Sequence, residues 1–285
     1  MENILKVSNL TKHYHDFSLA RVGFELPGGS IMGLIGENGA GKTTTLKLIL
    51  GLISADEGEV SLFDKRQTGD DREVKEQLGV VLDGSFFSDY LNAAEIGSAL
   101  RHFYKSFSPQ QYRAWLERFS LPTGKPVKDF SRGMRMKLAL SSALAHSPRL
   151  LILDEATSGL DPVVRSEVLD VFLDFIQDEE HSILFSSHIT GDLEQVADYI
   201  TFLHRGQVVF SSAKDLLLER YGVLRCGEAD FAALDHSALL GSRKNRFGYE
   251  ALVADRSGFQ QRYKNLVVDP AGLDDIMLFH IRGEH

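Results

Sequence analysis

Short apolar runs separated by turn-forming residues cover the first 84 positions of the chain. The runs before Pro27 are typical of antiparallel strands and occupy residues 4–7, 17–20 and 22–26. The pattern then predicts a buried strand, a helix and two short strands, at residues 30–35, 44–50, 58–63 and 78–82. The N-terminal part therefore predicts an antiparallel region that leads into an alternation of strands and helices.

A mostly helical pattern extends over residues 88–146, with breaks at Pro109 and Leu121–Gly124. The strand–helix alternation returns over residues 149–210. Its apolar runs predict buried strands of a parallel sheet at residues 150–153, 183–185 and 200–203. The fold class predicted from these periods is α/β, with a mainly helical insertion.

The pattern changes near Ser212, where short segments replace the long apolar runs. Helical patterns at residues 213–221 and 271–280 enclose three short strand-like segments, which predicts a small α/β appendage. Within the second helix, Asp274–Phe279 has one apolar face, which could dock on a partner; covering the appendage's own core is the interpretation that we favour. The predicted domains are residues 1–211, with a helical subdomain at about 86–146, and residues 212–285.

The composition is that of an ordinary globular protein, with 43% hydrophobic and 25% charged residues among 285. The net charge of −9 and the lack of an extended basic stripe argue against nucleic acid as the main partner. The single cysteine, Cys226, excludes an intramolecular disulfide and fits a reducing cytosol. No apolar run approaches about 18 residues and the N-terminus lacks signal-peptide features, so a partner would supply any membrane-spanning part.

The segment Gly36–Thr43 fits the phosphate-binding pattern G-x-x-x-x-G-K-[ST], between a predicted strand and a predicted helix. Glycines allow the backbone to approach phosphate closely, Lys42 can reach the β- and γ-phosphates, and Thr43 can place its hydroxyl on Mg²⁺. Backbone N–H groups of the loop and the helix N-terminus complete an anion site. The predicted nucleotide contacts are Gly36, Asn38, Gly39, Ala40, Gly41, Lys42, Thr43 and Thr44.

A second candidate site follows the apolar run Leu150–Leu153, which ends in Asp154 and Glu155. In proteins with a P-loop, an Asp at such a strand end helps to hold Mg²⁺. The next carboxylate is placed to polarise an attacking water. Four apolar residues followed by two acids are common alone, but with the P-loop they predict a magnesium and water site.

Together these motifs resemble the ATP-binding subunit of an ABC transporter over roughly residues 1–210. Lys42 matches the Walker A lysine of that family, and Asp154-Glu155 matches its Walker B pair. Ser158–Asp161 matches the D-loop, and His188 takes the position of the switch histidine. Tyr14 lies where the family stacks an aromatic ring on adenine. The resemblance implies a P-loop NTPase core with an antiparallel β subdomain and a helical signature subdomain, to which the C-terminal appendage is added.

The family's signature motif, usually L-S-G-G-Q, is represented here by Phe130–Met134. Ser131 and Gly133 are kept, and the S-R-G-M variant resembles that of ABC-2-type exporter ATPases. In the family, the signature of one subunit closes the ATP site of another. The resemblance therefore implies ATP and Mg²⁺ as cofactors and a head-to-tail dimer, either of this chain or with a closely related subunit. It also implies a separate membrane permease, export, and a cytoplasmic position at the inner face of the membrane.

One position departs from the family more sharply. Asp83 follows the predicted strand at residues 78–82, where the family has a Gln that helps to coordinate Mg²⁺. A carboxylate is also a hard oxygen donor, so we expect Asp83 to contribute to the metal site directly or through water; otherwise it is a solvated loop residue. The neighbouring segment Ser85–Leu91 is rich in aromatic residues and predicts a groove for a permease helix, part of the helical subdomain's core, or both.

In the resulting hypothesis, Glu155 acts as general base or orients the water, while His188 positions the water and the γ-phosphate. A non-transport ABC ATPase is the alternative, but its long coiled coil or second cassette is not seen in the sequence. A nucleotide-binding regulator with little turnover and an importer stay open as further alternatives. The histidines, such as His13, His15, His102 and His146, show no ligand-like cluster.

Overall fold

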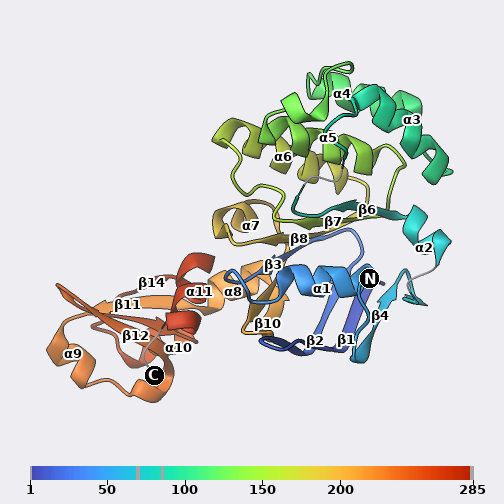
Figure 1. The fold of residues 1–285 in the computed structure, drawn as a ribbon. Helices are drawn as coiled ribbons and strands as arrows, with labels where there is room; N and C mark the ends of the chain where they lie inside the picture. Colours follow the sequence, from blue (N-terminus) through green and yellow to red (C-terminus); the bar gives the residue numbers. More distant parts are fainter. Residues whose placement is uncertain (1, 69–70, 85–86, 283–285) are drawn as a thin grey trace.

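The computed structural model describes residues 2–68, 71–84 and 87–282, which form three sheets with surrounding helices (Figure 1). The first sheet is antiparallel and confirms the expectation for the N-terminal region. Its strand order is β2-β1-β4-β5, with β1 at Asn3–His13, β2 at Ser18–Pro27, β4 at Glu57–Leu62 and β5 at Lys65–Arg66. From Val22 to Leu26, alternating burial along β2 places every second side chain in the core, as expected for a sheet with one covered face.

The central sheet has six strands in the order β10-β9-β3-β8-β7-β6. Its strands are β3 Ile31–Ile35, β6 Leu78–Val81, β7 Leu150–Asp154, β8 Ser182–Ser187, β9 Tyr199–His204 and β10 Gln207–Ala213. All pairings are parallel except that of β10 with β9. The buried strands match the continuous apolar runs, whereas β10 was not predicted, because it is an edge strand without a fully buried residue.

Helices cover both faces of the central sheet. Helix α1 (Lys42–Ile49) lies between this sheet and the antiparallel sheet, and its buried leucines belong to the same apolar cluster as β1 and β2. On the other face, α5 (Arg132–Leu144) and α6 (Pro162–Phe175) contribute Leu138 and Phe172 to the largest core. Outside them lie α3 (Ala93–Phe103) and α4 (Pro109–Arg118) of the predicted helical region, whereas the short α2 (Arg72–Glu76) lies at the edge of the sheet beside β6.

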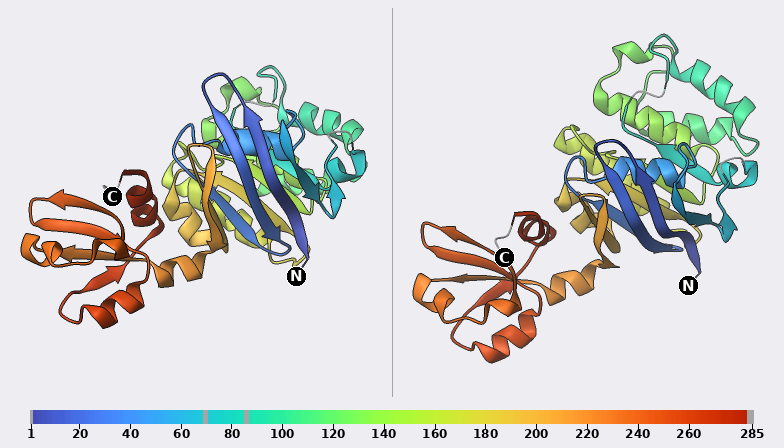
Figure 2. Two further views of the ribbon diagram at one scale, coloured as in Figure 1. Left: turned by 90° about the horizontal axis from the view of Figure 1, so that it is seen from below. Right: turned by 60° about the horizontal axis from the view of Figure 1, so that its bottom comes forward.

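The third sheet forms the C-terminal appendage, with the order β12-β13-β11-β14. Its elements are α8 Lys214–Arg220, β11 Gly222–Cys226, α9 Glu228–Ala232, β12 Leu239–Asn245, β13 Gly248–Val253, α10 Arg256–Arg262, β14 Val268–Pro270 and α11 Leu273–Arg282. Both views of Figure 2 show this orange-to-red unit beside the rest of the chain. The predicted domain boundary between residues 211 and 212 lies within β10 and stays a prediction.

Helix α11 packs on the appendage, as the sequence favours, and also extends beyond it. Its apolar residues Leu273, Ile276 and Phe279 are buried in the large core, which includes Val223 and Leu252 of the appendage as well as residues of α7 (Thr190–Val196). The helix packs against β12 and β13 and also against α7. Its apolar face therefore joins the appendage to the part of the chain that contains α7. None of the helices described here is both long and apolar enough to cross a bilayer.

Candidate functional site

The P-loop connects β3 to α1, as the sequence predicts. Gly39 and Gly41 have φ values of +84° and +108°, which side-chain-bearing residues rarely adopt. A Cβ on Gly36 would lie 2.4 Å from the carbonyl oxygen of Leu203, so only glycine fits this close approach. Gly41 is the N-cap of α1, and no described side chain caps the helix there. Backbone N–H groups at this end are thus available to an anion.

Lys42 places its ammonium group inside the loop, and the residue is only 6% exposed. Its Nζ donates to the carbonyl oxygens of Gly36 at 2.8 Å and Glu37 at 3.3 Å. It also lies 3.2 Å from Oε1 of Glu155. The cation is therefore held where a phosphate bound to the loop would meet it.

The hairpin formed by β9 and β10, which the motifs did not indicate, also contacts the P-loop. The N–H of Gly206, between β9 and β10, donates to the carbonyl oxygen of Ala40 at 3.0 Å. Nδ1 of His204 lies 3.1 Å from a carboxylate oxygen of Glu37. Sequence reasoning missed this contact because nothing in the local pattern links positions so far apart.

Asp154 lies at the C-terminal end of β7, fully buried, and faces the first turn of α1. Its two carboxylate oxygens accept hydrogen bonds from Thr43 Oγ1 at 2.8 Å and Ser186 Oγ at 2.5 Å. A carboxylate and a hydroxyl beside a phosphate loop are the hard oxygen donors that Mg²⁺ prefers. The residues present therefore fit a magnesium ion bound together with phosphate.

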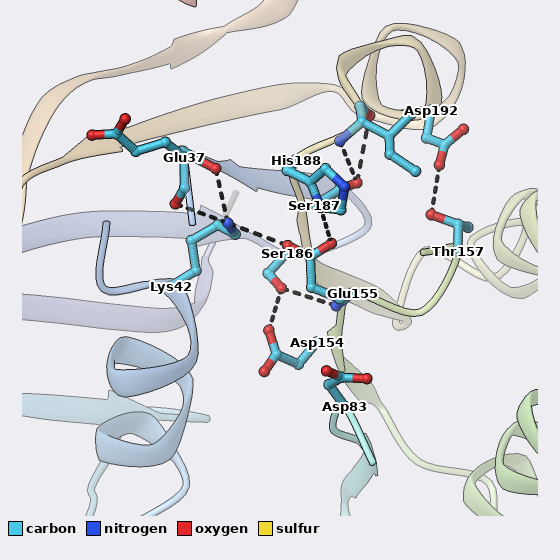
Figure 3. Close-up of polar contacts among 12 residues, drawn as sticks. Glu37, Lys42, Asp83, Asp154, Glu155, Thr157, Ser186, Ser187, His188 and Asp192 are labelled. Atoms are coloured by element: carbon cyan, nitrogen blue, oxygen red, sulfur yellow. Dashed lines mark hydrogen bonds and ion pairs between the residues drawn. The ribbon is translucent and has the colours of Figure 1, made fainter. Parts of the chain in front are cut away.

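Glu155 lies between Lys42 and His188 (Figure 3). Its Oε2 accepts a hydrogen bond from His188 Nδ1 at 2.6 Å, while its Oε1 pairs with Lys42. The Glu155 side chain is 13% exposed and that of His188 is more open. Glu155 has a φ of +52°, and its N–H donates to the carbonyl oxygen of Ser186 at 3.0 Å. A non-glycine residue in this region costs about 1–3 kcal/mol, a strain that is found mostly at functional sites.

The structure does not bring every predicted nucleotide contact to the P-loop. Tyr14 lies on the loop after β1, partly exposed, with its ring 6.5 Å from that of Phe17. Ser131 is the N-cap of α5 and accepts from the N–H of Met134 at 3.2 Å, and Gly133 lies one residue into this helix. Among the described residues, Ser131 makes no hydrogen bond to the P-loop, which is the arrangement expected if a second subunit completes the site.

Asp83 follows β6 with its side chain 65% exposed, and its Oδ1 lies 3.9 Å from the guanidinium of Arg132. Figure 3 places it below Asp154, with no drawn contact between the two. Within the aromatic segment, Tyr90 is well exposed and Leu91 partly so, while Phe87 packs against the large core. Ser85 and Phe86, which belong to the predicted groove segment, lie outside the described residues.

The four histidines named from the sequence lie in separate places. His13 contacts Ser18, His15 contacts Asp16, and His102 contacts the backbone of Ser98. His146 is buried, and its Nε2 donates to the carbonyl oxygen of Leu78 at 3.0 Å. Burial holds the pKa of His146 below its usual range, because the charged form would lose its hydration.

Comparison with known proteins defines the class to which this site belongs. The family described as "ABC transporter" matches residues 19–158. The bacitracin transport ATP-binding protein BcrA of Bacillus licheniformis is 33% identical over 77% of this chain and 73% of its own length. The lantibiotic transport ATP-binding protein SrtF of Streptococcus pyogenes is also 33% identical, over 74% of this chain and 92% of its own.

A solved ATP-binding subunit of an ABC transporter superposes with a TM-score of 0.66 and 28% identity, over 75% of this chain and 91% of the other. The chain therefore belongs to the ABC transporter family, as an ATP-binding subunit with ATPase activity. The predicted family, fold class and enzymatic activity are confirmed. The matched relatives are transport proteins, which favours transport over the regulatory alternative.

Proposed function

We propose that two copies of this chain, or one copy and a closely related subunit, bind two ATP molecules head to tail and hydrolyse them to drive export by a separate permease. The observation that carries the proposal is the cluster of Lys42, Glu155 and His188 directly beside the P-loop. It combines a cation that can bind phosphate, a carboxylate that can bind water, and an imidazole that directly follows the neighbouring strand β8.

Within each site, the loop amides from Gly36 to Thr44 and the ammonium of Lys42 hold the phosphates of ATP. Thr43 and Asp154 would hold Mg²⁺, which neutralises charge on the β- and γ-phosphates when bound. Tyr14 stacks on the adenine. Positioning and charge neutralisation account for most of the catalysis, because phosphoryl transfer needs little covalent chemistry from the protein.

Glu155 accepts a proton from, or orients, the attacking water, and His188 fixes that water relative to the γ-phosphate. In the described arrangement, Glu155 binds Lys42 directly. ATP binding must therefore exchange this ion pair for a contact between Lys42 and phosphate, which frees one carboxylate oxygen of Glu155 to face water. The partner's signature motif, with Ser131 and Gly133 at the start of α5, closes the site over the phosphates.

Closing and opening of the dimer would transmit the ATPase cycle to a permease, which places the chain on the cytoplasmic face of a membrane. Two relatives whose names specify bacitracin and lantibiotic transport support a transport role. The S-R-G-M signature supports export by resemblance. Exposed Tyr90 and Leu91 beside the helical region support a docking groove for the permease there. The net charge of −9 gives no support for a nucleic-acid partner.

Mixing two inactive variants tests the head-to-tail arrangement. Lys42→Ala and Ser131→Arg each damage both sites of their own homodimer. In a mixed dimer, one site combines the intact Lys42 of one subunit with the intact Ser131 of the other. With random pairing, we expect the mixture to recover about a quarter of the wild-type rate of phosphate release.

The matched control mixes Lys42→Ala with Glu155→Gln. Both residues lie in the same half of a site, so no mixed dimer contains an intact site and no activity should return. If the first mixture also stays inactive although both variants fold and bind each other, the composite site is wrong.

The role of Asp83 has its own test. If its carboxylate contributes to the metal site, Asp83→Ala should raise the Mg²⁺ concentration for half-maximal turnover by about tenfold, while Asp83→Gln should raise it less. Asp89→Ala is the control, because this nearby carboxylate pairs with Arg135 at 3.1 Å. An unchanged Mg²⁺ dependence in Asp83→Ala would assign Asp83 to a solvated loop position beside Arg132.

A further inference from the structure

The helix that follows the switch histidine is held from two sides. Helix α7 begins at Thr190, two residues after His188, and has seven residues. A helix this short is not stable alone, and no described side chain caps its N-terminus. Its position must therefore be set by contacts with neighbouring elements, and His188 is held between the end of β8 at Ser187 and the start of this helix.

On one side, α7 is tied to Thr157, which directly precedes the D-loop, and to α6. Asp192 is 2% exposed, and one carboxylate oxygen accepts a hydrogen bond from Thr157 at 2.5 Å (Figure 3). Its other oxygen pairs with the guanidinium of Arg165. A buried carboxylate with both oxygens engaged fixes the helix firmly, because releasing it would leave a buried charge without a partner. These contacts are all made within the nucleotide-binding part of the chain.

On the other side, α7 is tied to the appendage. The buried hydroxyl of Thr190 donates to the carboxylate of Asp274, in the first turn of α11. The carboxylate of Glu194 accepts from the backbone N–H of Leu273 at 2.5 Å. Leu273 and Ile276 of α11 are fully buried in the same cluster as Leu193. The polar contacts are thus surrounded by packed apolar side chains and partly shielded from water.

We infer that Asp274 of the C-terminal appendage is a positioning residue for the ATPase reaction: through Thr190 and α7 it fixes His188 against Glu155. The inference rests on the proposed role of His188. Asp274 does not touch the reacting groups, and its effect passes through one hydrogen bond and two residues of backbone. A shift of about 1 Å in a group that positions the reactants can lower a rate by about 100-fold, so a contact at this distance can control turnover.

Two substitutions remove opposite halves of the same hydrogen bond. We expect Asp274→Ala and Thr190→Val each to lower kcat by about tenfold and to change the KM for ATP by less than about twofold, because neither residue contacts the P-loop. Asp274→Asn keeps an oxygen that can accept from Thr190, so it should restore most of kcat. The Thr190→Val/Asp274→Ala double variant should be no slower than the slower single variant, since both remove one shared bond.

Asp269→Ala is the matched control within the appendage. It removes an exposed ion pair with Arg225 at 2.7 Å, between β14 and β11, and should leave kcat unchanged. Thermal unfolding is recorded for every variant. If Asp274→Ala and Thr190→Val lower the melting temperature but keep the wild-type kcat, Asp274 is only structural and the inference is overturned. The inference is also overturned if the double variant lowers kcat by the product of the two single-variant factors.

His188→Ala separates this inference from the proposed function. If His188→Ala keeps full turnover, the role of His188 fails and the inference fails with it. If His188→Ala loses turnover while Asp274→Ala behaves like the wild type, the proposed function stands and only the role of Asp274 is wrong.

Discussion

Glu155→Gln should bind ATP yet hydrolyse it about 10²–10⁴ times more slowly than the wild type. The substitution keeps the shape of the side chain and an oxygen that can accept from Lys42 or His188. It removes the negative charge and the ability to take a proton from water. Because the phosphate contacts are left in place, bound ATP should persist and hold the dimer closed. Single-turnover phosphate release measures the first effect, and light scattering with ATP measures the second.

Glu167→Gln is the control for this variant. Glu167 is also a carboxylate paired with a lysine, Lys137, but it lies on α6 away from the P-loop. Its turnover should equal that of the wild type. Wild-type turnover in Glu155→Gln would remove Glu155 from its assigned role and leave His188 as the group to test next.

Lys42→Ala is expected to have the second largest effect, on binding as well as on turnover. A hydrogen bond to a charged group contributes about 1.5–3 kcal/mol, so loss of the ammonium should weaken ATP binding by about 10- to 100-fold. Hydrolysis should fall further, because the lysine also stabilises charge on the γ-phosphate during transfer. Titration with a fluorescent ATP analogue and a phosphate-release assay measure the two effects separately.

Lys47→Ala provides a control on the same helix. Lys47 lies in the last turn of α1 and is exposed, so it shares the helix but not the loop. Its removal should change neither ATP binding nor turnover. If Lys42→Ala binds ATP as tightly as the wild type, the loop amides alone hold the nucleotide. In that case ATP binding does not replace the ion pair between Lys42 and Glu155 with a contact between Lys42 and phosphate.

The sequence predicted those parts of the site that local chemistry defines. The P-loop is a contiguous motif whose glycines have no substitute, so Gly36 and Gly41 could be recognised without a structure. Asp154 and Glu155 follow a run of buried apolar residues, and a strand end of a parallel sheet is where such carboxylates gather. In both cases the informative residues are neighbours in the chain.

The parts that were missed depend on contacts between distant positions. Strand β10 alternates weakly because it lies at a sheet edge with one side open. The support of the P-loop by His204 and Gly206 joins residues more than 160 positions apart, and no local pattern encodes it. The apolar face of α11 and its packing on the appendage were predicted, but its contact with α7 was not, because an amphipathic pattern shows that a helix face is covered without identifying every element that covers it.

The contact between Thr190 and Asp274 spans 84 positions, which affects when the site can form during synthesis. A ribosome adds about 5–20 residues per second, so α11 is made about 4–17 s after α7. The P-loop, the Walker B strand and the switch histidine are all in place earlier in the chain. During that interval the nascent protein has its phosphate loop but lacks the support that α11 gives to α7. If Asp274 positions His188, an incomplete chain can capture nucleotide before it can turn it over efficiently, so ATP hydrolysis is delayed until the appendage has folded.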